Sequence, residues 1–375
     1  MKRNSIVPSV LIITICIALA SYLLIQLVQD SDSDFEQDSK DYSVKEHKTR
    51  SLLKTNREIT EKITIGAIGD ILIHEPIYKD AFNGVQYNFD PMFENVKPLL
   101  SKPDVLTANQ ESTIGGASLG LSGYPRFNSP FEVADALVHS GVDIVSTANN
   151  HTLDKGEKGI KLEAAYLDSL GLLHVGSFLN EKDRQNLRIV NKNGIKLAFL
   201  SYTYGTNGIS VPHGKDFLVN LINRETMKEE IHRAKQHADV GVMSIHWGIE
   251  YKRIPTKEQK DLAKFLANEG VDIIIGSHSH VLQPMEWIKT ADGRQTFVIY
   301  SLGNFISAQY SNYRDIGGLA TIDITKTVSE KGSSIEFSNP VFYPTYVTRK
   351  KNQDFRVVPL ENAGSYGLQN AVAKN

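Results

Sequence analysis

Two histidines, His278 and His280, are separated by one residue and follow the apolar run 271–275. In an extended or loop backbone this spacing lets both imidazoles turn toward one point, and the glycine and serines around them leave room for an ion. An isolated pair of this kind also occurs on surface loops that bind nothing. The pair therefore predicts a metal site only if other parts of the chain supply further ligands.

Polar side chains that could bind a metal follow four other apolar runs. They are Asp70 and His74 after 63–68, Asn109 and Glu111 after 105–108, Asn149, Asn150 and His151 after 142–148, and His246 after 240–245. Singly, each has an ordinary explanation as a turn cap, an Asx-turn residue or a buried histidine with satisfied hydrogen bonds. Open α/β sheets, however, place their ligands at the carboxyl ends of strands. Recurrence at five strand ends favours one shared site.

The elements that must position these residues alternate between strand and helix patterns. Strand-like runs cover 63–70, 105–108, 142–148, 172–175, 195–202, 240–246, 271–275 and 297–301. Helical patterns cover 132–139, 157–170, 225–237 and 256–268. Thr256 and Gln259 have the spacing of a capping box. Helix, glycine and short apolar strand in this order predict an α/β fold whose adjacent strands run in parallel.

The later part of the chain contains more strands. Residues 191–194 predict a hairpin turn, which adds antiparallel pairing. After Gly317 the strand patterns are 319–325, 335–342 and 346–348. We interpret them as completing the sheet of a single domain that spans 61–362, followed by a loose tail at 363–375.

The amino terminus predicts a membrane anchor. Lys2 and Arg3 precede the apolar run 7–28, and a helix needs ~20 such residues to cross the bilayer core. A cleaved signal peptide is the alternative, but the Ala18-Leu19-Ala20 triplet lies inside the run rather than after it. Since basic residues stay cytoplasmic, we expect 1–28 to be an uncleaved, single-pass anchor in the cell membrane, with the rest extracytoplasmic.

An acidic linker is expected to follow at 29–60. Its composition is too polar to fold, and it contains a cluster of carboxylates at Asp30, Asp32, Asp34, Glu36, Asp38 and Asp41. Over the whole chain, 41% hydrophobic residues are enough for a sizeable core, and the net charge of -2 argues against a nucleic-acid partner. The single cysteine, Cys16, lies in the apolar run, which excludes a disulfide framework and a cysteine metal site.

Six blocks of the sequence resemble the poly-γ-glutamate capsule synthesis proteins of the CapA type, a branch of the calcineurin-like metallophosphoesterases. In the family's order they are residues 69–70, 109–111, 149–154, 246–251, 276–280 and 300–305. The resemblance covers about 63–305. It implies a four-layer α/β/β/α metallophosphoesterase sandwich with two divalent metal ions at the strand ends.

The resemblance also implies which side chains hold the ions. Ligands of the first ion would be Asp70, His280 and, as a further candidate, His74; those of the second would be Asn150, His246 and His278; Glu111 would bridge both. The sequence departs from the wider superfamily in the spacing between Asp70 and His74 and in having Glu111 where an aspartate usually bridges. Carboxylate, amide and imidazole ligands without a thiolate favour Mn, Fe or Zn.

Hydrolysis of a phosphoester without a covalent enzyme intermediate is the chemistry that this resemblance implies. Two such ions ~3.5–4 Å apart activate water and stabilise the oxygens of a phosphorus centre. His151 would donate a proton to the leaving oxygen, and Asp154 would orient its ring or else be an ordinary acid of a helix's first turn. Asn304 is interpreted as a turn residue. Further residues around the site, as supports or substrate contacts, would be Asn109, Asn149, Arg126, Trp247 and Glu250.

Two functions of different classes follow from this interpretation. The domain could be a hydrolase that cleaves an envelope phosphoester or phosphoanhydride. It could instead assist poly-γ-glutamate synthesis or export beside membrane-embedded ligase and export subunits, with a metal site that binds the anionic polymer without hydrolysing it. The prediction is a capsule-related role with a competent dimetal site, at the membrane and without a nucleic-acid partner.

Overall fold

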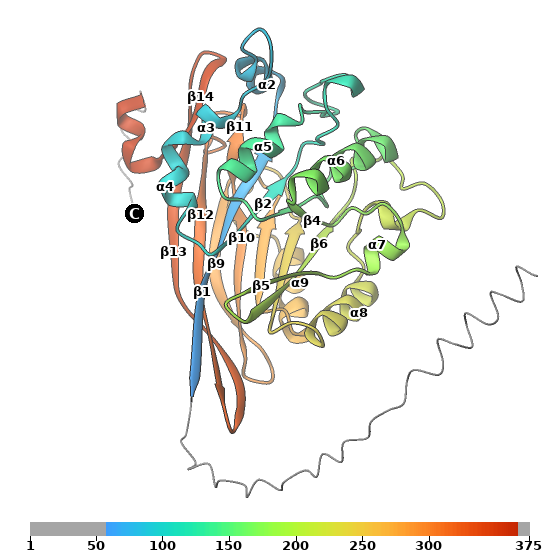
Figure 1. Ribbon diagram of the computed structural model, residues 1–375, viewed down its shortest axis with the longest axis vertical. Coiled ribbons are helices and arrows are strands. Elements are labelled where there is room, and N and C mark those ends of the chain that lie inside the picture. Colours follow the sequence, from blue (N-terminus) through green and yellow to red (C-terminus); the bar gives the residue numbers. More distant parts are fainter. Residues whose placement is uncertain (1–57, 367–375) are drawn as a thin grey trace, which may run out of the picture. The chain divides into compact units, whose positions relative to one another are not determined.

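The computed structural model describes residues 58–366 (Figure 1). The predicted anchor, the linker up to residue 57 and the tail beyond residue 366 lie outside the described residues. Between 58 and 366 no helix combines the length and the apolar character needed to cross a membrane. The first strand, β1 (Ile59–Leu72), begins two residues before the expected start of the domain, and the short helix η4 (Leu360–Tyr366) includes the first residues of the expected tail.

Two sheets form the centre of the domain. The eight-stranded sheet has the order β14-β13-β12-β1-β2-β3-β4, with β11 paired to β1, and the six-stranded sheet has the order β5-β6-β7-β8-β10-β9. The remaining strands of the first sheet are β2 (Val105–Gln110), β3 (Ile144–Ser146), β4 (Leu173–Val175), β11 (Asn304–Ser307), β12 (Ile316–Ser329), β13 (Gly332–Lys350) and β14 (Gln353–Pro359). Those of the second are β5 (Arg188–Lys192), β6 (Ile195–Thr203), β7 (Val240–His246), β8 (Ile273–Ser277), β9 (Leu282–Lys289) and β10 (Gln295–Leu302).

Each sheet has a parallel part, as the sequence predicts. Strands β1 to β4 are parallel neighbours, and so are β6, β7, β8 and β10. The predicted hairpin joins β5 to β6, where Asn193 and Gly194 both adopt the positive φ of a two-residue turn. Because parallel strands end at the same edge of a sheet, the residues that follow them are brought together.

Helices cover the outer faces of both sheets (Figure 1). They are α2 (Glu75–Ala81), α3 (Asp90–Phe93), α4 (Lys97–Leu100), α5 (Glu132–His139), α6 (Gly156–Leu170), α7 (Glu181–Gln185), α8 (Arg224–Lys235) and α9 (Lys257–Glu269). The four helices predicted from the sequence are α5, α6, α8 and α9. The predicted capping box of α9 is confirmed, because Thr256 and Gln259 each accept a hydrogen bond from the other's backbone N–H.

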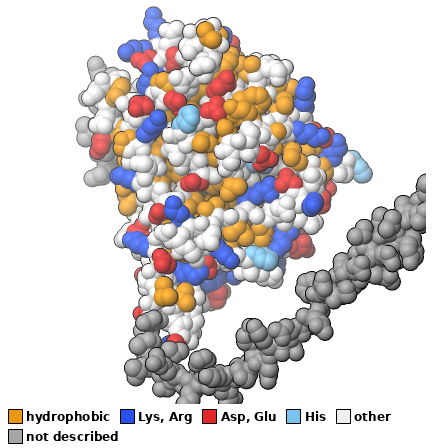
Figure 2. Space-filling view, viewed as in Figure 1, with side chains coloured by type: hydrophobic (Ala, Val, Ile, Leu, Met, Phe, Trp, Pro, Cys, Tyr) orange, Lys and Arg blue, Asp and Glu red, His pale blue; other side chains and the backbone are white. Residues whose placement is uncertain are grey.

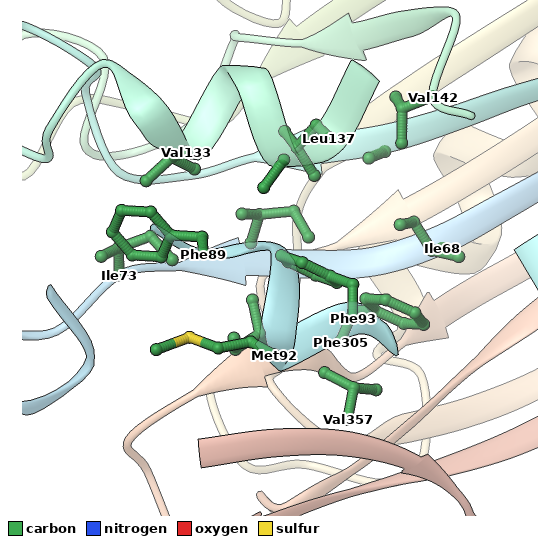
Figure 3. Close-up of a cluster of buried hydrophobic side chains, with 14 of the residues drawn as sticks. Ile68, Ile73, Phe89, Met92, Phe93, Val133, Leu137, Val142, Phe305 and Val357 are labelled. Atoms are coloured by element: carbon green, nitrogen blue, oxygen red, sulfur yellow. The ribbon is translucent and has the colours of Figure 1, made fainter. Parts of the chain in front are cut away.

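Three apolar clusters separate four layers. One lies between the sheets and includes Ile65 of β1 and Phe199 of β6. A second joins the outer face of the first sheet to α2–α6, and Figure 3 shows Phe93 and Leu137 of these helices beside Phe305. The third packs α8 and α9 on the second sheet. The arrangement is the α/β/β/α sandwich that the family resemblance implies, and burying both faces of each sheet provides most of its stability.

Some strands differ from the prediction. The patterns at 335–342 and 346–348 belong to one strand, β13, which pairs with β12 from Gly332 to Tyr346. Strand β9 was not predicted because most of its residues are exposed and its sequence, LQPMEWIK, has no apolar run. Strand β11 was not predicted because Gly303 and Asn304 at its start resemble a turn in sequence.

Charged residues of both signs are distributed over the surface. On the face seen in Figure 2, basic and acidic side chains alternate without forming a basic stripe. This distribution agrees with the net charge of -2.

Candidate dimetal site

The strand-end residues singled out from the sequence meet at the carboxyl ends of the parallel strands. Asp70 lies near the end of β1, Glu111 directly follows β2, His246 ends β7, and His278 and His280 follow β8. All five side chains are buried. Two sheets therefore contribute to one site, which the shared-site prediction requires.

The donor atoms of these side chains form two groups that share Glu111. One group is Asp70, Glu111 and His280, and the other is Glu111, His246 and His278; within each group the donor atoms lie within 4.8 Å of one another. Glu111 Oε1 is 3.5 Å from His280 Nε2 and 3.7 Å from His246 Nε2. A single carboxylate oxygen thus faces both groups, as a bridging ligand must.

The chemistry of these atoms fits two divalent cations. Among the described residues, Glu111 Oε1 and His278 Nδ1 are buried without a hydrogen-bond partner, which is rare for buried polar atoms. Burial lowers the pKa of His278 to about 3 and holds the pKa of His246 well below its ordinary value. Both imidazoles are therefore neutral at pH 7, the form that binds a metal.

The first group contains two carboxylates, those of Asp70 and Glu111. Burial raises the pKa of Glu111 well above its usual range. Burial also lowers the pKa of His280, but the carboxylates of Glu111 and Asp70 outweigh it and raise this pKa to about 9. A bound cation stabilises the carboxylates and displaces a proton from His280, so metal affinity should rise with pH.

The backbone around the two histidines is held in an uncommon conformation. His278 has φ 91° and His280 has φ 56°, in the left-handed region that costs residues with a Cβ about 1–3 kcal/mol. A Cβ on Gly276 would lie only 2.1 Å from the carbonyl oxygen of Tyr300, so only glycine fits there. These turns direct both rings into the site.

Neighbouring side chains fix the second group. Asn150 Oδ1 is 2.9 Å from His246 Nε2, and Ser277 Oγ is 2.8 Å from His246 Nδ1. Asn207 Oδ1 in turn accepts a hydrogen bond from Asn150 Nδ2 at 3.2 Å. The amide oxygen of Asn150 therefore lies beside His246, with which the resemblance groups it as a ligand of the second ion.

Two asparagines fix the first group. Asn109 Nδ2 donates to Asp70 Oδ1 at 2.8 Å and to Glu111 Oε2 at 3.3 Å, which keeps the two carboxylates side by side. The interpretation of Asn304 as a turn residue is wrong, because Asn304 is buried in β11 and its Oδ1 lies 3.1 Å from His280 Nδ1. It pairs with Asp70 across β1 and β11, so its side chain reaches the site.

A histidine and an aspartate stand beside the two groups. His151 Nδ1 is 2.7 Å from Asp154 Oδ2, and the same oxygen accepts the backbone N–H of Phe127 at 2.6 Å. Asp154 precedes α6, which begins at Gly156, so it is not an acid of that helix's first turn. This contact fixes the ring and leaves its other nitrogen available to a substrate.

Comparison with known proteins identifies the family. Residues 64–309 match the family described as bacterial capsule synthesis protein PGA_cap. The chain belongs to this family. It is 29% identical over 308 residues to the capsule biosynthesis protein CapA of Bacillus anthracis, covering 76% of this chain and 72% of that protein. It is 27% identical over 266 residues to the PGA biosynthesis protein CapA of Bacillus subtilis (strain 168), covering 64% of this chain and 62% of that protein. The resemblance stated from the six blocks is confirmed.

Solved structures with a similar chain path are more distant. A 5'-nucleotidase precursor from Thermus thermophilus has a TM-score of 0.43 at 14% identity, covering 80% of this chain and 54% of that one. The purple acid phosphatase PPD1 from yellow lupin has a TM-score of 0.32 at 10% identity, covering 61% and 53%.

Two of the predicted outer residues, Trp247 and Asn149, form hydrogen bonds with the backbone. The indole of Trp247 is buried in the third apolar cluster and donates to the carbonyl oxygen of Tyr300 at 3.0 Å. Asn149 accepts the backbone N–H of His151 at 2.9 Å and donates to the carbonyl oxygen of Gln110, which holds the loop in place.

The remaining candidates, His74, Arg126 and Glu250, do not belong to the two ligand groups that share Glu111. The Nδ1 atom of His74 lies 3.1 Å from the carbonyl oxygen of Leu72. Arg126 is exposed on its loop. Glu250 is exposed too, and its carboxylate forms a further group of potential ligands with His278 and His280.

Two residues near the site, Asn207 and Tyr204, were not predicted from the sequence. Asn207 contacts Asn150 and lies with its Nδ2 3.4 Å from His151 Nδ1, and the Tyr204 ring lies 4.7 Å from the His278 ring. Both follow β6, a parallel strand to whose carboxyl end the sequence prediction assigned no ligand. The strand-end rule applied there would have found them.

The segment that carries Glu111 rests on a buried glutamate of α6. Glu163 Oε1 accepts the backbone N–H of Ile114 at 3.1 Å, and burial raises the pKa of Glu163 from 4.5 to about 8. The folded protein therefore keeps this proton between pH 4.5 and 8 while the unfolded chain releases it. Stability from this group is present below pH 4.5 and is lost as the pH rises through that window.

Replacing Glu163 by glutamine should remove this pH dependence, because an amide keeps the acceptor for Ile114 without ionising. Relative to the wild type, Glu163→Gln should gain about 1.4 kcal/mol of unfolding free energy per pH unit across the window, on the order of a few kcal/mol in total. Chemical denaturation of both proteins at pH 4, 6 and 8 measures this. A stability difference that does not change with pH would contradict the prediction.

Proposed function

We propose that this protein is a membrane-anchored, extracytoplasmic component of poly-γ-glutamate capsule synthesis or export that carries a dimetal phosphoesterase site. The observation that carries the proposal is that two groups of buried ligands share the carboxylate of Glu111. Membership of the capsule synthesis family supports the biological role, and the names of the Bacillus relatives point to the same polymer.

Each residue of the site has a part in the proposed hydrolysis. Two divalent ions, when bound, supply an activated water and stabilise charge on a phosphorus centre. Asp70 and His280 would hold one ion, Asn150, His246 and His278 would hold the other, and Glu111 would be a ligand of both. Asn109 keeps Asp70 and Glu111 together against their mutual repulsion.

Proton transfer falls to His151 in this proposal. Its Nδ1 faces Asp154, so the proton that passes to the leaving oxygen comes from Nε2. Asp154 orients the ring and is itself fixed by the N–H of Phe127. The edge-on Phe127 ring, 4.7 Å from the His151 ring, restricts the imidazole further.

Anchoring and partners rest on the sequence. The apolar run 7–28, preceded by Lys2 and Arg3, supports a single-pass anchor that places the domain outside the membrane. The acidic linker predicted at 29–60 would separate the domain from the bilayer. Membrane-embedded ligase and export subunits for the polymer are the proposed partners.

Metal removal tests the proposed activity. The full-length chain in detergent should hydrolyse a generic phosphodiester such as bis-p-nitrophenyl phosphate after loading with Mn, Fe or Zn, and chelation should abolish the rate. A His246→Ala variant serves as the control that lacks one ligand of the second group, and it should stay inactive with added metal. Hydrolysis that survives chelation would contradict a metal-dependent reaction. Absence of hydrolysis with every metal, together with metal-dependent retention of poly-γ-glutamate, would favour the non-catalytic binding role.

A further inference from the structure

A short loop beside the candidate metal site presents aromatic rings to solvent. Within residues 308–314, Tyr310 and Tyr313 are 58% and 55% exposed. The guanidinium of Arg349 lies over the Tyr310 ring at 4.1 Å, and that of Arg253 lies over the Tyr313 ring at 4.3 Å. Exposed tyrosines stacked with arginines are typical of binding surfaces.

The same loop contacts the ligands of the first group. Arg314 lies over the ring of Tyr251 at 4.9 Å, and this ring lies 6.1 Å from the ring of His280. The carbonyl oxygen of Arg314 accepts a hydrogen bond from Asn304 Nδ2 at 2.7 Å, and Asn304 Oδ1 faces His280. We call Arg253, Arg314, Arg349 and the three tyrosines beneath them the arginine–tyrosine strip; it begins at the metal site.

The charges of the strip are not neutralised within the described part of the chain. None of its three arginines has a carboxylate oxygen within 4.0 Å among residues 58–366, whereas Arg188, Arg294 and Arg356 each pair with an aspartate. Positive charge therefore accumulates on one side of the site.

The stacked guanidiniums keep donors available for an anion. Arg314 uses two donor groups on Ser311, and Arg349 donates one hydrogen bond to the carbonyl oxygen of Ala308. A guanidinium has five N–H donors, and stacking on a ring leaves those in its plane free for bidentate bonds to carboxylate or phosphate. Each guanidinium lies on a different ring, so each can bind a separate anionic group.

We propose that the arginine–tyrosine strip binds a linear polycarboxylate chain and leads it to or from the metal site. The inference rests on the proposed function for the identity of the polymer, and it adds the surface that recognises it. A single small anion would occupy one guanidinium, whereas a chain of repeated carboxylates engages all three at once and gains affinity from multivalency. The tyrosine rings add apolar surface for the methylene groups between the carboxylates.

Binding of a fluorescent poly-γ-glutamate oligomer to the chelated full-length chain tests the strip, because these contacts need no metal. The triple variant Arg253→Gln, Arg314→Gln and Arg349→Gln should raise the Kd by about tenfold or more at low salt, as expected for the loss of three charge contacts. Arg224→Gln is the matched control, since Arg224 of α8 is exposed like Arg253 and its guanidinium also lies over a ring, that of Phe265 at 4.8 Å. It should change the Kd by less than about twofold.

The single variant Arg253→Gln is a second test that keeps the hydrogen bonds of Arg314 and Arg349 within the loop. It should weaken binding about two- to threefold and reduce the salt dependence of the Kd. Equal Kd values for the wild type and the triple variant would overturn the proposal, and so would binding of inorganic polyphosphate but not of polyglutamate. Phosphodiester hydrolysis by the metal-loaded wild type is a separate readout, so loss of the proposed activity and loss of the strip are distinguishable.

Discussion

Replacing Glu111 by glutamine is expected to prevent loading of both metal ions and to lower phosphodiester hydrolysis on the order of 10³-fold, the several kcal/mol that bound metals contribute to such a reaction. Glu111 is the shared member of both ligand groups, and it is the only carboxylate of the group that contains His246 and His278. Glutamine has the same length but no charge, so two cations would face each other without the anion between them.

The metal content of the purified full-length chain, measured by mass spectrometry beside the rate, checks this prediction. Glu230→Gln is a matched control, because Glu230 is also a buried glutamate but lies in α8, where it accepts a hydrogen bond from the Tyr202 hydroxyl. The control should keep the wild-type metal content. Wild-type metal content in Glu111→Gln would show that Glu111 does not bridge.

Substitution of His151 by alanine should slow hydrolysis by about 10²- to 10⁴-fold for a substrate with an alkoxide leaving group, the range expected when a general acid is lost. His151 belongs to neither ligand group, so the metal content should stay the same. With a p-nitrophenolate leaving group, which departs without a proton, the loss should shrink to about tenfold or less.

Asp154→Asn refines the role of this pair. Asparagine keeps an oxygen for the N–H of Phe127 but no longer stabilises the charged ring or fixes its tautomer, so an intermediate loss with the same leaving-group pattern is expected. Steady-state rates on paired alkyl and p-nitrophenyl substrates measure both effects. An equal loss of rate on both substrates would show that His151 acts through something other than proton donation.

Much of this site was predictable because side chains that can bind a metal follow the apolar runs of parallel strands. Parallel strands end at one edge, so a polar residue after an apolar run has a predictable place even when its partners are far away in the chain. Asp70 and His280 are 210 residues apart, yet their side chains lie 3.0 Å apart. Asp154 was a candidate partner of His151 because it lies three positions further along the chain, and a local turn brings the two into contact.

The residues that the sequence did not place depend on contacts with no local signal. Asn304 looks like a turn residue beside Gly303, and only the pairing of β11 with β1 brings its side chain to His280. Whether a strand-end residue faces the site also depends on the backbone. His74 follows β1 as expected, but its ring nitrogen is directed at the carbonyl oxygen of Leu72.

Edge strands limited the prediction of the fold for a related reason. Apolar runs mark β7 and β8 because both of their faces are buried. Strand β9 lies at the edge of its sheet with most residues exposed, so its sequence pattern resembles that of a loop. The arginine–tyrosine strip was likewise not predicted, since its three arginines come from separate parts of the chain.

The central claim is that Glu111 bridges two ions. Anomalous diffraction from crystals of the metal-loaded protein, recorded at the Mn or Zn edge, tests it most directly. We expect two peaks, one beside Asp70 and His280 and one beside His246 and His278, with the Glu111 carboxylate between them. A single peak, or two peaks that do not both contact Glu111, would contradict the account.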